Sequence, residues 1–163
     1  MTPEQKVAHF DTLAHIKQVA RYLQVCLVEL SVRSTIHDNS KLESPEMEVF
    51  AKVTPILKTL EYGTPEYTEM LEQIRPCINH HYAANRHHPE HFENGVSDMN
   101  LLDVLEMICD WCAAVKRTEN GNIYKSLEIN KERFKLDDQL YTILKNTVDW
   151  FQQLNKVSHE KML

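Results

Sequence analysis

Glycine is scarce in this chain, and that scarcity restricts the folds open to it. Only three glycines occur among the 163 residues, at Gly63, Gly95 and Gly121. Domains rich in strands normally use glycine in the many tight turns that join their strands. Because 42% of the residues are apolar and 26% are charged, the composition is otherwise that of a globular protein. The sequence therefore predicts an all-α fold.

Three short sequences have the composition of a helix start and support the same fold class. "TPE" begins at Thr2, "SPE" at Ser44 and "TPE" at Thr64. In each, the hydroxyl can cap the first turn, proline fits the first helical position, and glutamate favours the positive helix end. With apolar residues at helical spacing, they predict helices over about 3–33, 45–60, 65–83, 97–118, 122–134 and 137–155.

These elements predict one single-domain helical bundle of about six helices over residues 1–163. "ENGN" at 119–122 is expected to end the fourth helix. The segment 85–98 contains Pro89, Asn94 and Gly95, and most of it is expected to be irregular.

Charge and apolar patterning exclude several function classes. The net charge is -6 and no basic run occurs, so binding to a nucleic-acid polymer is not expected. No apolar run approaches membrane-spanning length, and "MTPEQKVAHF" has no signal-peptide pattern, which predicts a cytoplasmic protein without a membrane partner. The spacing of the cysteines is not that of a disulfide framework, so we expect them to be small core residues: Cys26, Cys77, Cys109 and Cys112. A zinc or redox role for "CDWC" is the alternative.

Histidine is concentrated in one segment, "HHYAANRHHPEH" at residues 80–91. Five of the nine histidines lie there: His80, His81, His87, His88 and His91. A metal site, a solvated polar surface and a pH-sensitive patch are all compatible with the segment by itself. The choice depends on whether other parts of the chain supply partners.

Other polar residues occur where such partners would be needed. The pair His37–Asp38 offers an imidazole and a carboxylate, both good ligands for divalent transition metals, although a helix-terminal histidine beside a turn-forming aspartate explains it equally simply. His15 lies on a mostly apolar face of the first predicted helix, where a partly buried core histidine is the simpler interpretation.

The fourth predicted helix carries three carboxylates on one face. Asp103, Glu106 and Asp110 are spaced i, i+3 and i+7, a pattern that usually marks a solvated face. Asp110, however, lies in an apolar run, and burying it there would be costly unless it is paired or bound to a metal.

Taken together, the order along the chain is His15, His37–Asp38, His81, His87 or His88, and Asp110. Each falls on or beside a different predicted helix or helix end. Helices of a bundle can direct such side chains at one point, as bundle metal sites do. The joint pattern therefore predicts a metal site.

That order, H…HD…H…H…D, resembles the HD-domain superfamily of metal-dependent phosphohydrolases, which implies an HD-domain-like bundle. "HDNSK" is similar to the "HD-x-G-K" variant, with Ser40 in place of glycine, and Lys41 matches a lysine that often lies near substrate phosphate. "CDWCAA" resembles the closing helix, with Asp110 as the last ligand. The extra histidines resemble the subgroup with two metals. However, His81 and His87 or His88 are closer together in the sequence than in that subgroup, so the sequence does not decide between one ion and two.

A closer resemblance is to an uncharacterised family of small phage and bacterial proteins. Its pattern of HD-x-SK, H-x3-N-x-HH and EM-x-CDW reads here as "HDNSK" at 37–41, "HYAANRHH" at 81–88 and "EMICDW" at 106–111. This resemblance supports the site and does not indicate a substrate.

The resemblance implies hydrolysis of a nucleotide or related small phosphoester with one or two divalent ions of Mn, Fe, Ni, Co or Zn. It implies a first ion held by His15, His37, Asp38 and Asp110. His81 with His87 or His88 would hold a second ion or the phosphate. We expect Lys41 and Arg86 to bind phosphate oxygens, and Glu106 to act as a general base or to orient a ligand. A di-iron oxygenase and a non-catalytic nucleotide-binding phage protein are the alternatives, and homo-oligomer formation stays open.

Overall fold

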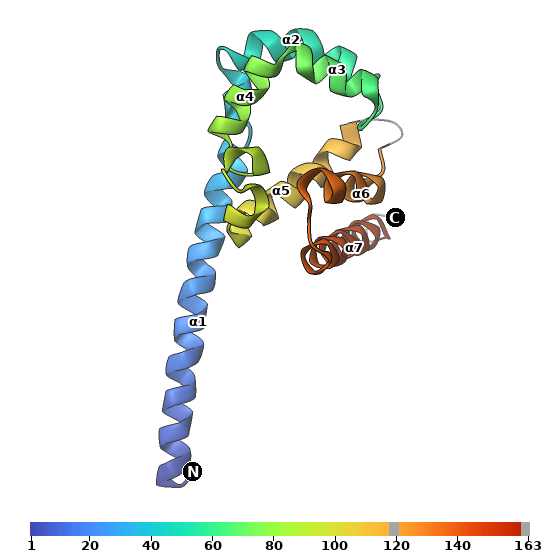
Figure 1. Ribbon diagram of the computed structural model, residues 1–163. Helices are drawn as coiled ribbons and strands as arrows, with labels where there is room; N and C mark the ends of the chain where they lie inside the picture. The colour runs from blue at the N-terminus through green and yellow to red at the C-terminus, as the bar shows by residue number, and fades with distance from the viewer. Residues whose placement is uncertain (118–120, 161–163) are drawn as a thin grey trace. The chain divides into compact units, whose positions relative to one another are not determined.

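The computed structural model describes residues 1–117 and 121–160, and this part of the chain is all-α (Figure 1). It contains seven α-helices and four short 3-10 helices, and no strand occurs in the described residues. The predicted fold class is therefore confirmed. Contacts divide the chain into two compact units, Met1–His37 and Asp38–Leu163. One domain over 1–163 accordingly stays a prediction.

The first unit is a single helix, α1, from Pro3 to Ile36. Thr2 caps it in a capping box: its hydroxyl accepts from the Gln5 backbone, and the Gln5 side chain accepts from the Thr2 backbone. The N–H of His37 donates to the carbonyl of Arg33 and completes the last turn. Both the predicted start and the predicted extent of this helix are close to the observed ones.

The second unit begins with the 3-10 helix η1 (Asn39–Leu42), followed by α2 (Glu46–Leu57), α3 (Pro65–Gln73) and α4 (Arg75–Ala84). The prediction of one helix over 65–83 is wrong, because the chain leaves helical geometry at Ile74. Pro76 explains the break: it lacks the N–H that a continuous helix would donate to the carbonyl of Glu72, and its ring crowds that carbonyl. The interruption lets α4 take its own direction against α2.

Two of the three predicted N-caps can be compared directly in this unit. Thr64 caps α3 as predicted, since its hydroxyl accepts from the backbone N–H of Tyr67. The prediction that Ser44 caps α2 is wrong, because Pro45 is the residue at the N-cap position and no side chain caps this helix. Glu46 is then the first helical residue and is buried.

The remaining helices are α5 (Leu101–Ala114), α6 (Ile123–Phe134) and α7 (Asp138–Glu160), which pack together around the main apolar core (Figure 1). Asn100, and not Ser97 or Asp98, caps α5 by accepting from two backbone N–H groups. The predicted helix end at 119–122 lies partly outside the described residues. The buried core consists of Met107, Ile108, Trp111, Ile123, Leu127, Leu136, Leu144 and Val148.

Between α4 and α5 the chain is largely irregular, as predicted for 85–98, with 3-10 turns η2 (Pro89–His91) and η3 (Gly95–Asp98). A polar network connects this region to α6. The guanidinium of Arg133 donates to the hydroxyls of Tyr62 and Tyr82 at 3.1 Å each, and it pairs with Glu90. These bonds hold α4 and the segment that follows it in a defined position within the second unit.

The cysteines are free thiols. Cys77 is buried as predicted, but the core assignment is wrong for Cys109, which is exposed because α5 turns Met107 and Ile108 towards the core. Among the described helices, none combines the length and the apolar character that crossing a bilayer requires.

Candidate metal centre

Four polar side chains of the second unit meet at one point. One ligand atom from each of Asp38, His81, His87 and His88 lies within 4.8 Å of the ligand atoms of the other three. We call these four residues the histidine cluster. Asp38 precedes η1, His81 lies in the last turn of α4, and the other two follow α4 directly.

The separations within the histidine cluster match those of atoms bound to one ion. The Nε2 atoms of His81 and His88 are 2.9 Å apart. Oδ1 of Asp38 lies 3.3 Å from Nε2 of His81 and 3.5 Å from Nε2 of His87. Ligand atoms held at about 2.0–2.1 Å from a metal are separated by about 2.8–3.4 Å in octahedral or tetrahedral geometry. The donor set and its spacing therefore fit a divalent transition metal.

The end of α4 brings its histidines together. Asn85 takes an extended conformation, which stops the helix, and the N–H of His88 donates to the carbonyl of Asn85 in the turn that follows. The chain thereby folds back, and His88 reaches His81, which lies one turn before the helix end. The side chains of His81 and His87 are 3% and 2% exposed, so the site is largely shielded from water.

Two of the histidines are held by carboxylates on the side away from Asp38. Nδ1 of His81 lies 2.8 Å from Oε2 of Glu46, and Nδ1 of His87 lies 3.3 Å from Oε1 of Glu106. An ionised carboxylate can only accept, so these contacts require the proton on Nδ1. Each Nε2 then presents its lone pair towards the cluster. Histidines that bind metals are oriented by this same arrangement.

The charge state of the cluster follows from burial and from its partners. Burial alone would raise the pKa of Asp38, but the contact with His81 and the charge of Lys41 hold that pKa well below its ordinary value. Nζ of Lys41 donates to Oδ2 of Asp38 at 2.6 Å. Burial, reinforced by His87 and His81, lowers the pKa of His88 to about 2. An ionised aspartate and a neutral imidazole are the protonation states that bind metals.

Asp38 also has an unusual backbone, with φ 58° and ψ 13° in the left-handed region. Aspartate tolerates this conformation better than most residues, because its short polar side chain can bond locally. The conformation places a sharp turn in the chain directly before η1.

The acidic face of α5 is engaged by the histidine-rich segment. Asp103 is fully buried and accepts two bonds from Arg86, at 3.2 Å to Nε and 3.0 Å to Nη2. Glu106 contacts His87, as described above. A carboxylate oxygen of Asp110 lies within 4.8 Å of a carboxylate oxygen of Asp38. The face is thus not simply solvated, which the spacing alone had left open.

The predicted site residues are therefore only partly brought together. Lys41 donates to Asp38, and Glu106 contacts His87. Asp110 lies close to Asp38, while Arg86 forms an ion pair with Asp103.

His15 lies in the first unit and the histidine cluster in the second, so the role of His15 as a ligand stays a prediction. One continuous helix separates His15 from His37, and 22 residues at 1.5 Å per residue correspond to about 33 Å. His37 is the last residue of the first unit and is joined to Asp38 by one peptide bond. Its role as a ligand stays a prediction.

Sequence reasoning missed Glu46 and gave no role to Ser40 and Asn85. Glu46 looked like an ordinary acidic residue of a first helical turn. Ser40 and Asn85 occur in the HD-x-SK and H-x3-N patterns, but the patterns did not indicate what either residue does. In the structure the Asn85 amide donates to the Ser40 hydroxyl, which donates to Glu46, at 2.8 and 3.0 Å.

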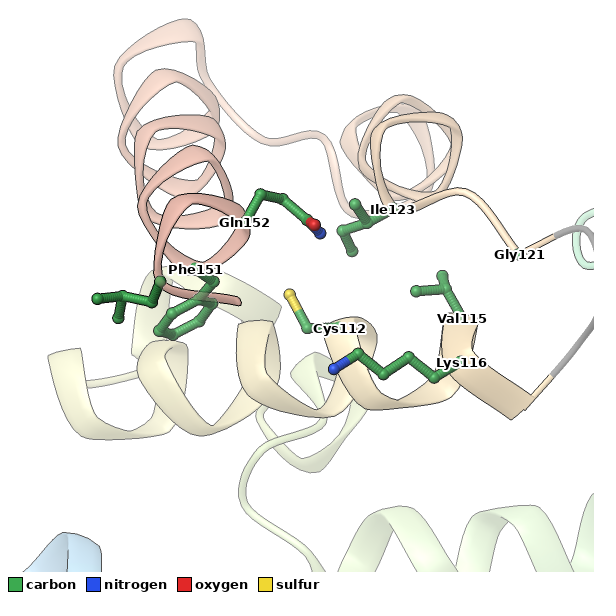
Figure 2. Close-up of a pocket in the computed structure, with 8 residues that line it drawn as sticks. Cys112, Val115, Lys116, Gly121, Ile123, Phe151 and Gln152 are labelled. Atoms are coloured by element: carbon green, nitrogen blue, oxygen red, sulfur yellow. The ribbon is translucent and has the colours of Figure 1, made fainter. Parts of the chain in front are cut away.

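The described residues also line cavities outside the histidine cluster. One of about 590 Å³ opens between α5, α6 and α7, where the side chains of Cys112 and Gln152 point towards one another (Figure 2). Another, of about 660 Å³, is lined by Pro89, Glu90, residues 92–97, residues 133–137 and Leu140. Its lining begins at Pro89, the residue after His88.

The fold and the cluster define an all-α protein with a candidate metal centre. Residues 4–154 match the profile of a family of unknown function (DUF5662), and the chain belongs to that family.

The chain is also similar to flagellar hook-basal body complex protein FliE of Pseudomonas aeruginosa (strain PAO1) and of Pseudomonas paraeruginosa (strain PA7), at 34% identity over 65 residues in each case. Those matches cover 40% of this chain, which spans 60% of the length of each of these curated relatives. No solved structure matches.

Proposed function

We propose that this protein is a metal-dependent phosphohydrolase acting on a nucleotide or a related small phosphoester of the cytoplasm. One observation carries the proposal: three imidazole nitrogens and one carboxylate oxygen, from residues up to 50 positions apart, lie within 4.8 Å of one another. Free thiols suit the reducing compartment. The resemblance of "HDNSK" and "CDWCAA" to the HD-domain superfamily supports the reaction class.

The number and type of the ligand atoms limit which metals are expected at the cluster. When bound, a divalent ion would lower the pKa of a water molecule and neutralise charge on the phosphoryl group. Four protein ligands complete the tetrahedral shell that zinc prefers, which is typical of closed structural sites. Manganese, iron, cobalt and nickel accept more ligands, so they leave a position for water. We therefore favour one ion of this group at the histidine cluster.

The surrounding side chains have separate tasks in this proposal. Lys41 donates to Asp38 at 2.6 Å and is 29% exposed, so it can also attract a substrate phosphate. Glu106 orients His87 and so needs no role as a base. Arg86 is paired with Asp103, and we assign it to the stability of α5 rather than to the substrate.

The test begins with metal analysis of untagged protein. Bound manganese, iron, cobalt or nickel near one ion per chain is expected, with loss of the ion in His87→Ala. His9→Ala, a histidine of α1 outside the cluster, is the matched control and should keep the ion. Hydrolysis of phosphoesters is then measured over a nucleotide panel with each metal. Protein that binds none of these metals, or a loaded protein that cleaves no phosphoester, refutes the proposal at the corresponding step.

The donor set also favours a second candidate. Two histidines and one carboxylate with open positions are typical of non-haem iron oxygenases, and the cluster contains such a triad in His81, His88 and Asp38. Oxygen consumption by the iron-loaded protein, with no release of phosphate, would favour this candidate. A nucleotide that is bound and recovered unchanged would instead indicate a binding protein.

A further inference from the structure

Glu46 is a fully buried carboxylate held between two consecutive histidines. Its side chain is 0% exposed, in the first turn of α2. Oε1 lies 2.8 Å from Nδ1 of His80, and Oε2 lies 2.8 Å from Nδ1 of His81. Both oxygens therefore accept from ring N–H groups of α4.

A chain of hydrogen bonds fixes the orientation of this carboxylate. The Ser40 hydroxyl donates to Oε2 of Glu46 at 3.0 Å. The amide nitrogen of Asn85 donates to Ser40 Oγ and to the carbonyl oxygen of His81, at 2.8 Å each, which uses both of its hydrogens. The Ser40 hydroxyl is thus left with its own hydrogen for Glu46. The carboxylate cannot rotate without breaking several of these bonds.

Three side chains donate to the buried carboxylate of Glu46. The bonds from His80, Ser40 and His81 replace the water that the carboxylate loses on burial. Its position at the start of α2 adds the favourable end of the helix dipole. An ionised carboxylate without partners would be costly at a buried position, so the arrangement depends on the histidines as much as they depend on it.

Both ring nitrogens of His81 have contacts. Nδ1 faces Glu46, while Nε2 lies 2.9 Å from Nε2 of His88 and 3.3 Å from Oδ1 of Asp38. The equivalent contact of His87 with Glu106 is longer, at 3.3 Å, and the Glu106 side chain is 15% exposed. Of the two carboxylate contacts behind the cluster, that of Glu46 is therefore the shorter and the more deeply buried.

We infer that Glu46 is a positioning residue of the metal centre, which holds the proton of His81 on Nδ1 and directs the Nε2 lone pair at the ion. The inference rests on the proposed function, because it needs a metal at the histidine cluster. Ser40 and Asn85 act through Glu46. This gives a physical reason for serine in "HDNSK" and for asparagine four residues after His81. Loss of such a partner typically weakens metal binding by about 10- to 100-fold.

The first experiment compares Glu46→Gln with Glu48→Gln in the full chain. Glutamine has the size of glutamate, but its amide group cannot accept from both histidines. Glu48 is exposed in the same turn of α2 and provides the matched control. Metal-free proteins are titrated with Co²⁺ in competition with a chromophoric chelator. We expect Glu46→Gln to bind Co²⁺ about 10- to 100-fold more weakly and Glu48→Gln to bind like the wild type.

The outcomes separate this inference from the proposed function. Wild-type protein that does not bind Co²⁺ refutes the metal centre itself. Wild-type binding together with an unchanged Glu46→Gln affinity refutes only the role of Glu46.

A second measurement does not depend on the variant folding. Long-range ¹H–¹⁵N spectra of metal-free wild-type protein report which nitrogen of His81 carries the proton. Protonation on Nδ1 is expected, and protonation on Nε2 overturns the inference.

A third measurement records the visible spectrum of Co²⁺ bound to the wild type and to each variant. A changed spectrum in Glu46→Gln is expected because the His81 ligand is altered, and a merely structural role of Glu46 would leave that spectrum unchanged.

Discussion

Replacing Arg86 by alanine should destabilise the second unit. Asp103 is 0% exposed, and Arg86 donates two bonds to it. Asp103 also accepts from the backbone N–H of Asn100, at 3.0 Å. In Arg86→Ala the aspartate stays buried while the guanidinium that neutralises it is lost. Removing one partner of a buried ion pair is among the few changes that destabilise a protein by several kcal/mol.

The magnitude follows from burial on the two sides of the pair. Breaking a buried ion pair costs about 3–5 kcal/mol. The Arg86 side chain is 49% exposed, so water already screens part of the attraction, and we reduce the value to about 2–3 kcal/mol. The guanidinium also lies 4.9 Å from the centre of the Phe92 ring, a contact of about 0.5–1 kcal/mol that is lost as well. The expected loss is about 2.5–4 kcal/mol.

Urea unfolding followed by tryptophan fluorescence measures this loss, because Trp111 is buried in the core of the same unit. With a slope of about 2 kcal/mol per M, the midpoint should fall by about 1–2 M. Asp103→Asn removes the charge and keeps an oxygen for the Asn100 N–H. Arg86→Ala with Asp103→Asn should therefore be more stable than Arg86→Ala alone. A loss below about 0.5 kcal/mol, or a double variant no more stable than the single one, would refute the reasoning.

Gly63→Ala should lower the Tm more than Gly95→Ala: both have positive φ, which costs about 1–2 kcal/mol, but only a Cβ at Gly63 would also meet a side chain, Cδ1 of Ile129 at 2.9 Å. Equal losses in thermal unfolding would contradict this. Leu127→Ala removes a 0% exposed core side chain and should cost about 2–5 kcal/mol in urea unfolding, with a loss under about 1 kcal/mol as the contrary result. A divalent ion at about 100 times its Kd should stabilise the wild type by about 2.7 kcal/mol, and His88→Ala should abolish this gain in a thermal shift assay; an equal gain in both proteins would contradict the site.

Helix content and several helix ends could be predicted because their causes are local. Capping at Thr2 and Thr64 depends on residues within three positions of the cap. The break at Ile74 was also encoded locally, in Pro76, but the apolar spacing across it favoured one long helix. At Ser44 the composition of a helix start was present, and the observed start is one residue later.

The candidate site was predictable only in part. Histidine and aspartate at helix ends indicated a metal site, and the motif resemblance selected His81, His87 and His88 from the five histidines of the segment. The ligand role of His15 stays a prediction, because His15 lies in the first unit and the histidine cluster in the second.

By itself, the sequence determined that the chain is helical and which residue types could bind a metal, since both follow from local propensity and side-chain chemistry. Only the tertiary structure decided which of them meet. It joined Glu46 to His81 across 35 positions and Asp103 to Arg86 across 17. The physical reason is that a buried carboxylate must find a partner, and which partner it finds depends on how α2, α4 and α5 pack, not on any spacing along the chain.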